Sequence, residues 1–347
     1  MPSTAIELDA DGVAVRLSSP DKPYFPELGL TKLHVANYVQ SVGEGLLAAL
    51  RNRPTTLERW PGGVQPGATI TSRAGRGAAF YQKKAPFSMP EHVQTATVTY
   101  PSGRTAQQVM PTCLADLLWL VNLGTLRFHA WPVTAPETEL VDQLRLDLDP
   151  QPGTGIAEAR QVALELRALL AELALESFCK TSGGRGLHVY ASVEPIDFID
   201  ARHAAIAIGR ELARRMPELV TVDWWKEERG ERIFVDFNQM ARDRLMSSAY
   251  SIRPVPEALV SAPLDWDEVA EVDPREFTVA TMPARFEQVG DPWEPLYRVS
   301  PASLATALDW YARDAAAGQG EMPYPPEYPK MPGEPPRVQP SRQRRID

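Results

Sequence analysis

The stretch "QLRLDLDPQPGTG", residues 143–155, decides which fold the chain can adopt. Three leucines alternate here with Arg145, Asp147 and Asp149, and a period of two is typical of a β-strand. Both aspartates then point to one face of the strand, about 6.6 Å apart along it. Like charges at that separation repel by about 2.5 kcal/mol at an effective dielectric constant near 20. A strand that tolerates this repulsion indicates that the two carboxylates have a ligand.

The segments that follow predict a domain with a mixed sheet. Residues 156–176 and 200–216 repeat their apolar positions with the period of an amphipathic helix. Residues 187–193 ("LHVYASV") predict a strand between these helices. Two further apolar runs, 219–225 and 232–239, flank the charged turn "KEERGE" and predict a hairpin. This order of elements favours an α/β domain with a mixed sheet around residues 140–260.

The regions on either side predict a smaller module before this domain and an extended segment after it. We expect strands at 12–19 and 92–100, a helix over 32–50 capped by Thr31, and a buried helix from Cys113 that Gly124 ends. Residues 59–86 are rich in glycine and arginine and predict a loop. Residues 318–347 contain eight prolines and a basic end, which indicates a segment that is either disordered or extended over the body.

Composition is that of a globular protein, and the charge distribution favours an anionic ligand. The chain has 347 residues, 44% of them hydrophobic, which suffices for one large domain or two, and no apolar run is long enough to span a membrane. Two cysteines, Cys113 and Cys179, predict a reducing, cytoplasmic location and no zinc site. The net charge is −9, but Lys22 to Lys84 holds nine Lys or Arg against three acids. This basic segment is either a solvated face or a grip for an anion.

A metal site is one explanation of the paired aspartates. Two carboxylates on one face of a strand suit Mg²⁺ or Mn²⁺, which take oxygen ligands, although two exposed aspartates on an edge strand would have the same pattern. Asp236 in "ERIFVDFNQ" sits in another apolar run and would join Asp147 and Asp149 if the strands are neighbours. Three such acids can hold two cations for a phosphoryl transfer. Alternatively, Asp236 ends its strand and faces water.

A glycine-rich turn and an aromatic-basic segment are the other candidates for binding. In "KTSGGRGLHVY", residues 180–190, the turn at Ser182, Gly183 and Gly184 can present backbone N–H groups to an anion, while Arg185 and His188 can contact phosphate. The spacing is not that of a P-loop, and a core histidine after a glycine-rich loop is the alternative.

In "AFYQKKAP", residues 79–86, two adjacent aromatics precede two lysines. Aromatic rings beside cations suit stacking on an exposed base while phosphates are held, and buried core aromatics are the alternative.

Taken together, these segments resemble one family. "RWPGGV…FYQKKAP", "LRLDLDP", "KTSGGRGLHVY", "VDFNQ" and "YSIRP" stand in the order seen in the polymerase domain of the bacterial end-joining ligase LigD, of the archaeo-eukaryotic primase superfamily. The resemblance covers roughly residues 10–300. It implies an α/β (α+β) primase-like core with an RRM-like catalytic module over 136–300 and a smaller N-terminal α/β module over 1–135. A C-terminal helix over 301–317 and the proline-rich tail over 318–347 would follow.

The resemblance also implies roles for particular residues. Asp147, Asp149 and Asp236 would be catalytic ligands of two Mn²⁺ or Mg²⁺ ions. The expected nucleotide-binding residues are Ser182, Gly183, Arg185, His188, Arg253, Lys83, His129, Gln239 and Arg229. The expected DNA-binding residues are Lys22 and Lys32, which match a pocket for a 5′-phosphate, together with Arg53, Phe80, Tyr81, Arg73 and Arg76.

The expected function is a DNA-directed primase-polymerase that adds NTPs or dNTPs, prefers ribonucleotides, and fills short gaps from a 5′-phosphate during repair. The chain ends without ligase or phosphoesterase domains, so the resemblance extends to stand-alone mycobacterial primase-polymerases such as Prim-PolC, some of which start primers. A longer segment at 64–79 would alter the grip on template or primer. We expect a monomer in the cytoplasm, associated with the nucleoid and without a membrane partner.

Three alternatives remain open. The same chemistry could serve end joining with Ku and a separate DNA ligase. A non-catalytic module that binds DNA ends would keep the fold without the reaction. A metal-dependent nuclease would use the same cluster of acids, although a triphosphate-type loop argues against it.

Overall fold

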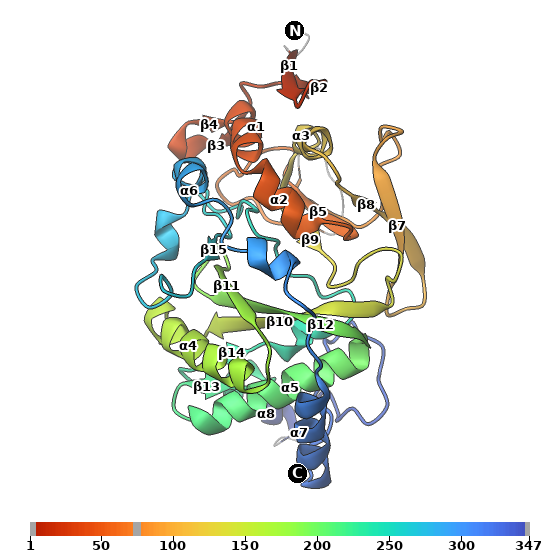
Figure 1. The fold of residues 1–347 in the computed structure, drawn as a ribbon, viewed down its shortest axis with the longest axis vertical. Helices are drawn as coiled ribbons and strands as arrows, with labels where there is room; N and C mark the ends of the chain where they lie inside the picture. The colour runs from red at the N-terminus through yellow and green to blue at the C-terminus, as the bar shows by residue number, and fades with distance from the viewer. Residues whose placement is uncertain (1–4, 72–77, 344–347) are drawn as a thin grey trace.

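The strand predicted from residues 143–149 is β10 (Leu140–Pro150), and it lies inside a six-stranded sheet. The computed structural model describes residues 5–71 and 78–343. In spatial order the sheet is β13-β14-β10-β12-β11-β15 (Figure 1). Its other strands are β11 (Ser177–Thr181), β12 (Leu187–Asp197), β13 (Val220–Thr221), β14 (Ile233–Val235) and β15 (Pro263–Leu264).

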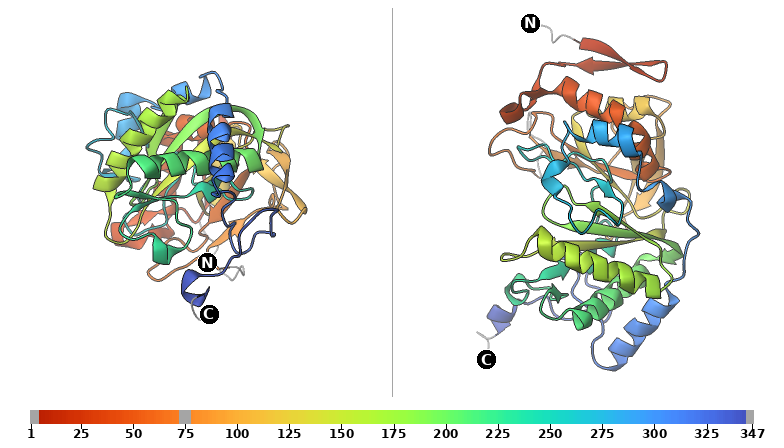
Figure 2. Two further views of the ribbon diagram at one scale, coloured as in Figure 1. Left: turned by 90° about the horizontal axis from the view of Figure 1, so that it is seen from below. Right: turned by 60° about the vertical axis from the view of Figure 1, so that its left-hand side comes forward.

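Two helices cover one face of this sheet and leave the other face to the aspartates. The helices are α4 (Ile156–Glu172) and α5 (Phe198–Arg215), and both pack against β10 and β12 (Figure 2). Leu144, Leu146 and Leu148 are buried, as the alternating pattern predicts. β12 runs antiparallel to β10, so that Asp147 lies opposite His188.

The predicted hairpin over residues 219–239 is wrong. β13 and β14 pair in parallel, and β14 takes β10 as its antiparallel partner. The residues between them form the short helix η2 (Lys226–Glu228) and a loop in which Arg232 bonds to Asp223. This connection is longer than a hairpin turn and returns the chain to the starting end of β13, which makes the parallel pairing possible.

A five-stranded sheet forms the N-terminal part of the body. Its strands are β5 (Thr55–Arg59), β6 (Phe80–Gln82), β7 (Gln94–Thr99), β8 (Thr105–Met110) and β9 (Thr125–Ala130), with β9 beside β5. The segment 59–86 is therefore loop only in part, because β6 pairs with β5. The strand predicted at 92–100 is confirmed as β7, which pairs with β8.

Three helices pack on this part of the chain. They are α1 (Lys32–Ser41), α2 (Gly43–Leu50) and α3 (Leu114–Asn122). Thr31 caps α1 as predicted, but the single helix expected over 32–50 breaks at Val42. The break lets α2 press against Tyr250, because a Cβ on Gly45 would lie 2.5 Å from that ring.

Smaller elements complete the described chain. They are β1 (Ala5–Ala10), β2 (Val13–Ser18), β3 (Pro23–Phe25), η1 (Pro26–Leu28), β4 (Leu30–Thr31), η3 (Phe237–Met240), η4 (Pro274–Glu276), α6 (Met282–Val289), η5 (Glu294–Tyr297), α7 (Ala305–Ala316) and α8 (Pro340–Gln343). The residues described include no helix that is both long and apolar enough to cross a membrane.

Buried arginines join the two sheets. Arg145 of β10 donates to the backbone carbonyls of Ala130 and Trp131 at the end of β9, at 2.5 and 2.9 Å. Arg53 is also buried and makes a two-pronged ion pair with Asp142, at 2.6 and 3.0 Å. Both guanidinium groups thus fix the position of β10 relative to the N-terminal sheet.

Much of the proline-rich tail is extended over the body. Of the two expectations for this segment, disorder or an extended path over the body, the structure therefore supports the second. Helix α7 packs on α5, and the chain then returns along the same region. Arg202 of α5 bonds to Glu321 and to the carbonyl of Met322, and Tyr324 is buried. Asn238 of η3 donates to the carbonyl of Pro323 at 3.0 Å, which ties the tail to the segment that carries Asp236.

Candidate active site

The predicted acids and the glycine-rich turn meet in one hollow of about 530 Å³, on the sheet face opposite α4 and α5. Strands β10 and β12 supply Asp147, Asp149 and His188, and the turn between β11 and β12 supplies Ser182 and Arg185. The segment after β14 contributes another group of residues. These are Asp236, Gln239, Ser247 and Arg253.

Asp236 does not lie within a strand. It follows β14 and caps η3, where one carboxylate oxygen accepts from the Asn238 backbone N–H at 3.0 Å. Its other oxygen accepts from the Gln239 side chain at 2.9 Å. The backbone N–H of Asp236 donates to the carbonyl of Asp147 at 3.0 Å, which holds the third acid beside β10. The structure therefore places Asp236 beside Asp147, at the end of a strand rather than within one.

Two of the three acids, Asp147 and Asp236, have a raised pKa. Burial raises the pKa of Asp147 well above its usual range, and the charges of Asp236 and Asp149 raise it further. Burial also raises the pKa of Asp236, although hydrogen bonds from Gln239 and Asn238 oppose the effect. The cluster therefore favours a positive partner, because a bound cation, like a proton, reduces the repulsion between its carboxylates.

The donors fit a hard cation in chemical type. All three are carboxylates that line the same hollow, and hard divalent cations take oxygen ligands. The three carboxylates do not have the geometry of a complete metal site. Over residues 5–71 and 78–343, no group of three His, Cys, Asp or Glu side chains is arranged so that it could hold a metal ion. Asp149 is instead held by the Gln151 side chain at 3.0 Å.

The glycine-rich turn is stabilised by internal hydrogen bonds to the Ser182 side chain. The Ser182 hydroxyl oxygen accepts from the backbone N–H groups of Gly184 and Gly186, at 3.1 and 3.2 Å. Of the three backbone N–H groups predicted to face an anion, that of Ser182 donates to the carbonyl of Gly186 and that of Gly184 to the Ser182 hydroxyl, so two are used within the turn. The side-chain donors that line the hollow here are the Ser182 hydroxyl, the exposed Arg185 and Arg253.

Arg253 is placed by close packing rather than by hydrogen bonds. Its guanidinium lies against Gly184, where an added Cβ would come within 3.0 Å of it. In the described chain its side chain makes one hydrogen bond, a long one of 3.5 Å to the carbonyl of Ser182. A guanidinium has five N–H donors, so most of those on Arg253 are available to a ligand in the hollow.

His188 connects the acids to a buried lysine. Its Nε2 lies 3.5 Å from a carboxylate oxygen of Asp147, and Lys180 lies 2.8 Å from its Nδ1. Burial and the charge of Lys180 lower the pKa of His188 well below its usual value, so the ring is neutral at pH 7. With Lys180 donating to Nδ1, the ring proton sits on Nε2 and faces Asp147.

Sequence reasoning missed Arg127 and Glu58, and it placed His129 too near the hollow. Arg127 lines the hollow and pairs with the buried Glu58 at 3.0 Å, whereas His129 lies behind it and also contacts Glu58 at 3.0 Å. Burial would raise the pKa of Glu58, but His129 and Arg127 overcome this and lower it to about 2. Tyr81 rests edge-on against His129, with 5.6 Å between ring centres. The only signal for Arg127 is its place in "NLGTLRFHAW".

Two predicted nucleotide-binding residues have supporting positions. Gln239 lines the hollow but is bonded to Asp236. Arg229 is buried over the ring of Phe234, and it donates to Gln151, which in turn holds Asp149. Arg229 therefore acts on the acids through a neighbour.

A second hollow of about 320 Å³ contains the two predicted phosphate-binding lysines. Lys22 and Lys32 line it together with Arg59, which sequence reasoning missed. Lys32 is buried and bonded to the carbonyl and side chain of Asn122, at 2.7 and 2.8 Å. The expectation that Arg53 contacts DNA is not supported, because Arg53 is buried against Asp142.

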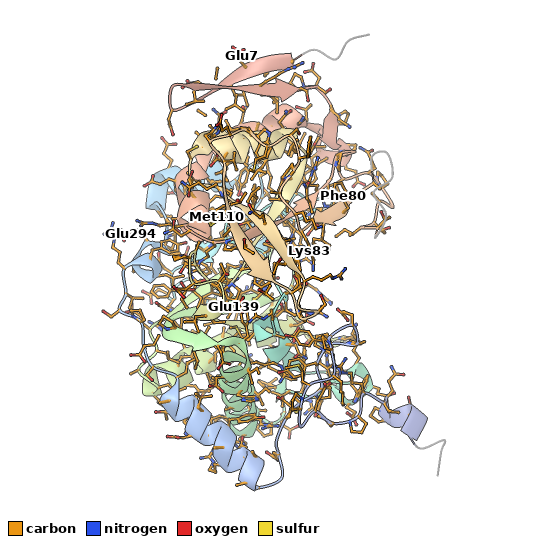
Figure 3. The ribbon with its side chains drawn as sticks, turned by 90° about the vertical axis from the view of Figure 1, so that its right-hand side faces the viewer. Glu7, Phe80, Lys83, Met110, Glu139 and Glu294 are labelled. Carbon is orange, nitrogen blue, oxygen red and sulfur yellow. The ribbon has the colours of Figure 1, made fainter. Side chains whose placement is uncertain are left out.

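Strand β6 links this second hollow to the acids. Arg59 lies over the ring of Phe80, with 5.1 Å to its centre, and bonds to the side chain of Gln82. Tyr81 is exposed, and Phe80 and Lys83 lie on the same side of the molecule (Figure 3). Lys83 pairs with Asp243 outside the main hollow. Arg73 and Arg76 lie outside the described residues.

Comparisons with known proteins identify the family. The model of the LigD primase-polymerase domain matches residues 31–293, which is more than half of the chain. LigD of Mycolicibacterium smegmatis, a multifunctional non-homologous end joining protein, is 31% identical over 319 residues, with 91% of this chain and 40% of the relative covered. LigD of Pseudomonas aeruginosa is 31% identical over 287 residues, covering 80% of this chain and 32% of the relative.

A solved structure gives the same result for the fold. The polymerase domain of Mycobacterium tuberculosis ligase D, in complex with DNA, matches with a TM-score of 0.73 and 31% identity. The match covers 82% of this chain and 98% of that domain, whereas the chain spans 40% of the length of the mycobacterial LigD proteins it resembles. The primase-like α/β fold is thereby confirmed, and the chain belongs to the LigD primase-polymerase domain family.

Proposed function

We propose that the protein is a DNA-directed primase-polymerase, a nucleotidyltransferase that fills short gaps during DNA repair. One observation carries this proposal: three carboxylates face Arg253, Arg185 and Ser182 across a single hollow. That arrangement places sites for cations opposite donors for a triphosphate, as nucleotidyl transfer requires. The solved relative is a polymerase domain in complex with DNA, which supports the same reaction.

The side chains divide the work in this proposal. Asp147, Asp149 and Asp236 would hold Mn²⁺ or Mg²⁺, which supplies electrostatic stabilisation of charge on the phosphoryl oxygens when bound. Arg253 and Arg185 would orient the triphosphate, and His188, with its proton on Nε2, would donate a hydrogen bond beside Asp147.

The hollow of Lys22, Lys32 and Arg59 would hold the 5′-phosphate at the far side of the gap. Three cationic side chains around one small hollow suit a phosphate dianion, and such a contact positions DNA without reading its bases. Through Arg59 this site contacts Phe80, which we propose stacks with Tyr81 on the template or terminal base.

The experiment that tests this function is extension of a labelled primer across a short gap, with Mn²⁺ and either NTPs or dNTPs. The downstream strand carries a 5′-phosphate or a 5′-hydroxyl. We expect faster addition of NTPs and faster extension when the phosphate is present. Equal rates with and without the phosphate would contradict the second hollow's role, and equal rates with both nucleotide types would contradict the ribonucleotide preference.

Stimulation by the 5′-phosphate should fall as the pH rises from about 7 to 9. Burial, with Lys22 and Arg59 nearby, lowers the pKa of Lys32 to about 8, so the ammonium loses its charge above that pH. The phosphate remains a dianion throughout, since its second pKa is about 6. The ratio of extension rates on phosphorylated and unphosphorylated substrates reports the effect.

A Lys32→Arg variant is the control for this pH dependence. Its guanidinium stays charged up to a pH of about 12, so the ratio should be flat over the same range. If the variant and the wild type show the same decline, Lys32 is not the group that titrates.

Non-homologous end joining with Ku and a separate ligase is a second candidate, favoured by the relatives, which are non-homologous end joining proteins. It uses the same chemistry on broken ends. Bridging of two DNA ends with 3′-overhangs by this protein would support it. Filling of gaps without any bridging would support excision repair instead.

A further inference from the structure

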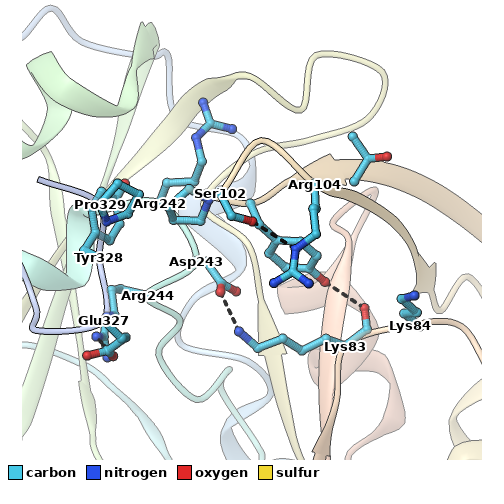
Figure 4. Close-up of a pocket in the computed structure, with 13 residues that line it drawn as sticks. Lys83, Lys84, Ser102, Arg104, Arg242, Asp243, Arg244, Glu327, Tyr328 and Pro329 are labelled. Carbon is cyan, nitrogen blue, oxygen red and sulfur yellow. Dashed lines mark hydrogen bonds and ion pairs between the residues drawn. The ribbon is translucent and has the colours of Figure 1, made fainter. Parts of the chain in front are cut away.

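A third hollow, of about 490 Å³, lies beside the active site and has no part in the function proposed above (Figure 4). We call it the side groove. Five cationic side chains line it: Lys83, Lys84, Arg104, Arg242 and Arg244. Among the residues that the structure describes, only two carboxylates line it, those of Asp243 and Glu327. A net positive hollow on a chain of net charge −9 indicates a site for an anion.

Two chain segments lead from the region of the active site to the side groove. The segment after Asp236 contributes Gln239 and Ser247 to the active-site hollow, whereas Arg242 and Arg244 between them line the side groove. In the same way, β6 places Tyr81 against His129 behind the active site, and the chain after it brings Lys84 to the side groove. A polymer in the active site would therefore pass the side groove next.

Its cations differ in how far they are already occupied. Arg242 bonds to Glu139 at 2.8 Å and to the carbonyl of Thr99 at 3.3 Å, and Lys83 pairs with Asp243 at 2.5 Å. Arg242 and Lys83 therefore connect the segments that form the groove.

The other cationic side chains of the groove are available to bind a ligand. Lys84 and Arg104 are exposed, and no ion pair is found for either among the residues described. Arg244 is paired with Glu327, which belongs to the C-terminal tail rather than to either sheet (Figure 4). A carboxylate from a separate segment thus occupies one cation, as a phosphate oxygen would.

We propose that the side groove binds the phosphodiester backbone of single-stranded template DNA that continues from the active site. Its phosphates contact Lys84, Arg104 and Arg244, and Glu327 gives way at Arg244. Tyr100 and Tyr328 also line the groove, and aromatic side chains beside cations are a combination typical of single-strand binding. This inference rests on the proposed function, since it takes the DNA in the active site as given.

The test compares two primer–template duplexes by fluorescence anisotropy. One has a template overhang of a single nucleotide, and the other an overhang of about ten nucleotides, within the usual range of single-strand sites. We expect the wild type to bind the longer overhang about tenfold more tightly, and R104A/R244A to bind both alike. Between about 50 and 200 mM salt, the double variant should lose about 1.4 from the salt slope on the longer overhang, at about 0.7 per phosphate.

Two further variants make the test specific. R275A/R313A removes the same charge from exposed sites outside the groove and should keep the tenfold preference. E327Q removes the competing carboxylate and should tighten binding of the longer overhang about two- to fivefold, the range of a surface ion pair. If R275A/R313A behaves like R104A/R244A, the effect is one of net charge and the groove is not the site.

The outcome is separable from the proposed function. Equal affinity of the wild type for the two overhangs would overturn the side groove, whatever the activity. A wild type that extends no primer but still prefers the longer overhang would overturn the polymerase proposal and leave the binding result in place.

Discussion

Replacing Asp147 and Asp149 together by asparagine should reduce primer extension by on the order of a thousandfold, since bound cations supply several kcal/mol of stabilisation and about 1.4 kcal/mol is a factor of ten in rate. Asparagine keeps the shape of each side chain and removes the charge that holds a cation. Single-turnover extension of a labelled primer measures the loss. DNA affinity should stay within about threefold, because the variant keeps the cationic groups around both hollows.

The stability of this variant separates lost chemistry from lost folding. Burial and the charges of Asp236 and Asp149 raise the pKa of Asp147, so at neutral pH its ionised form is less favourable in the folded protein than in the unfolded chain. The midpoint of thermal unfolding should therefore stay level or rise. D309N/E287Q, which neutralises two exposed acids on α7 and α6, is the matched control and should keep full activity. Full extension by D147N/D149N would contradict the assignment of the acids.

Replacing Arg253 by alanine should raise the KM for the incoming nucleotide by about 10- to 100-fold, with a smaller change in kcat. The guanidinium makes one long hydrogen bond within the described chain and presents its other donors to the hollow. A hydrogen bond to a charged group contributes about 1.5–3 kcal/mol, which gives that range. Steady-state kinetics on a gapped duplex, with the nucleotide varied, measure it.

Arg253→Lys is the matched variant, since it keeps the charge but loses the planar set of donors. Its KM should lie between those of the wild type and R253A. Arg145, by contrast, uses its donors on Ala130, Trp131 and Gln143, so the same replacement there should destabilise the fold. A fall in kcat for R253A at constant KM would show that Arg253 acts on the chemical step and not on binding.

Regular alternation made strand β10 predictable from sequence. The leucines of β10 bury one face, and this fixed the direction of Asp147 and Asp149 before any contact was known. The cap of α1 by Thr31 was predictable for a similar reason, because it depends only on residues that are close in sequence. Asp236 was found by its residue type in an apolar run, although its actual place after β14 depends on long-range pairing.

The errors come from contacts between distant parts of the chain. Parallel pairing of β13 with β14 depends on the position of β10, which no local pattern encodes. Arg53 stands in a basic segment and looks like a DNA contact, but its partner Asp142 is far away in sequence. Arg127 and Arg59 were missed for the same reason, because only the fold brings them to the hollows.

The backbone of the glycine-rich turn illustrates a subtler limit. Its sequence suggests free N–H groups for an anion, whereas Ser182 satisfies two of them within the turn. Residue types alone do not reveal such internal hydrogen bonds. In the proposed function, side chains, chiefly Arg253 and Arg185, therefore bind the anion.

The most direct measurement of the central claim is templated incorporation by the wild-type protein on four gapped duplexes that differ only in the template base. Each duplex is supplied with Mn²⁺ and all four NTPs, and both the labelled primer and the released pyrophosphate are followed. We expect each primer to gain the complementary nucleotide, with one pyrophosphate released per nucleotide added. Bound DNA without extension would leave a DNA-binding module, and shortening of the primer without NTPs would reveal a nuclease; either result would contradict a polymerase.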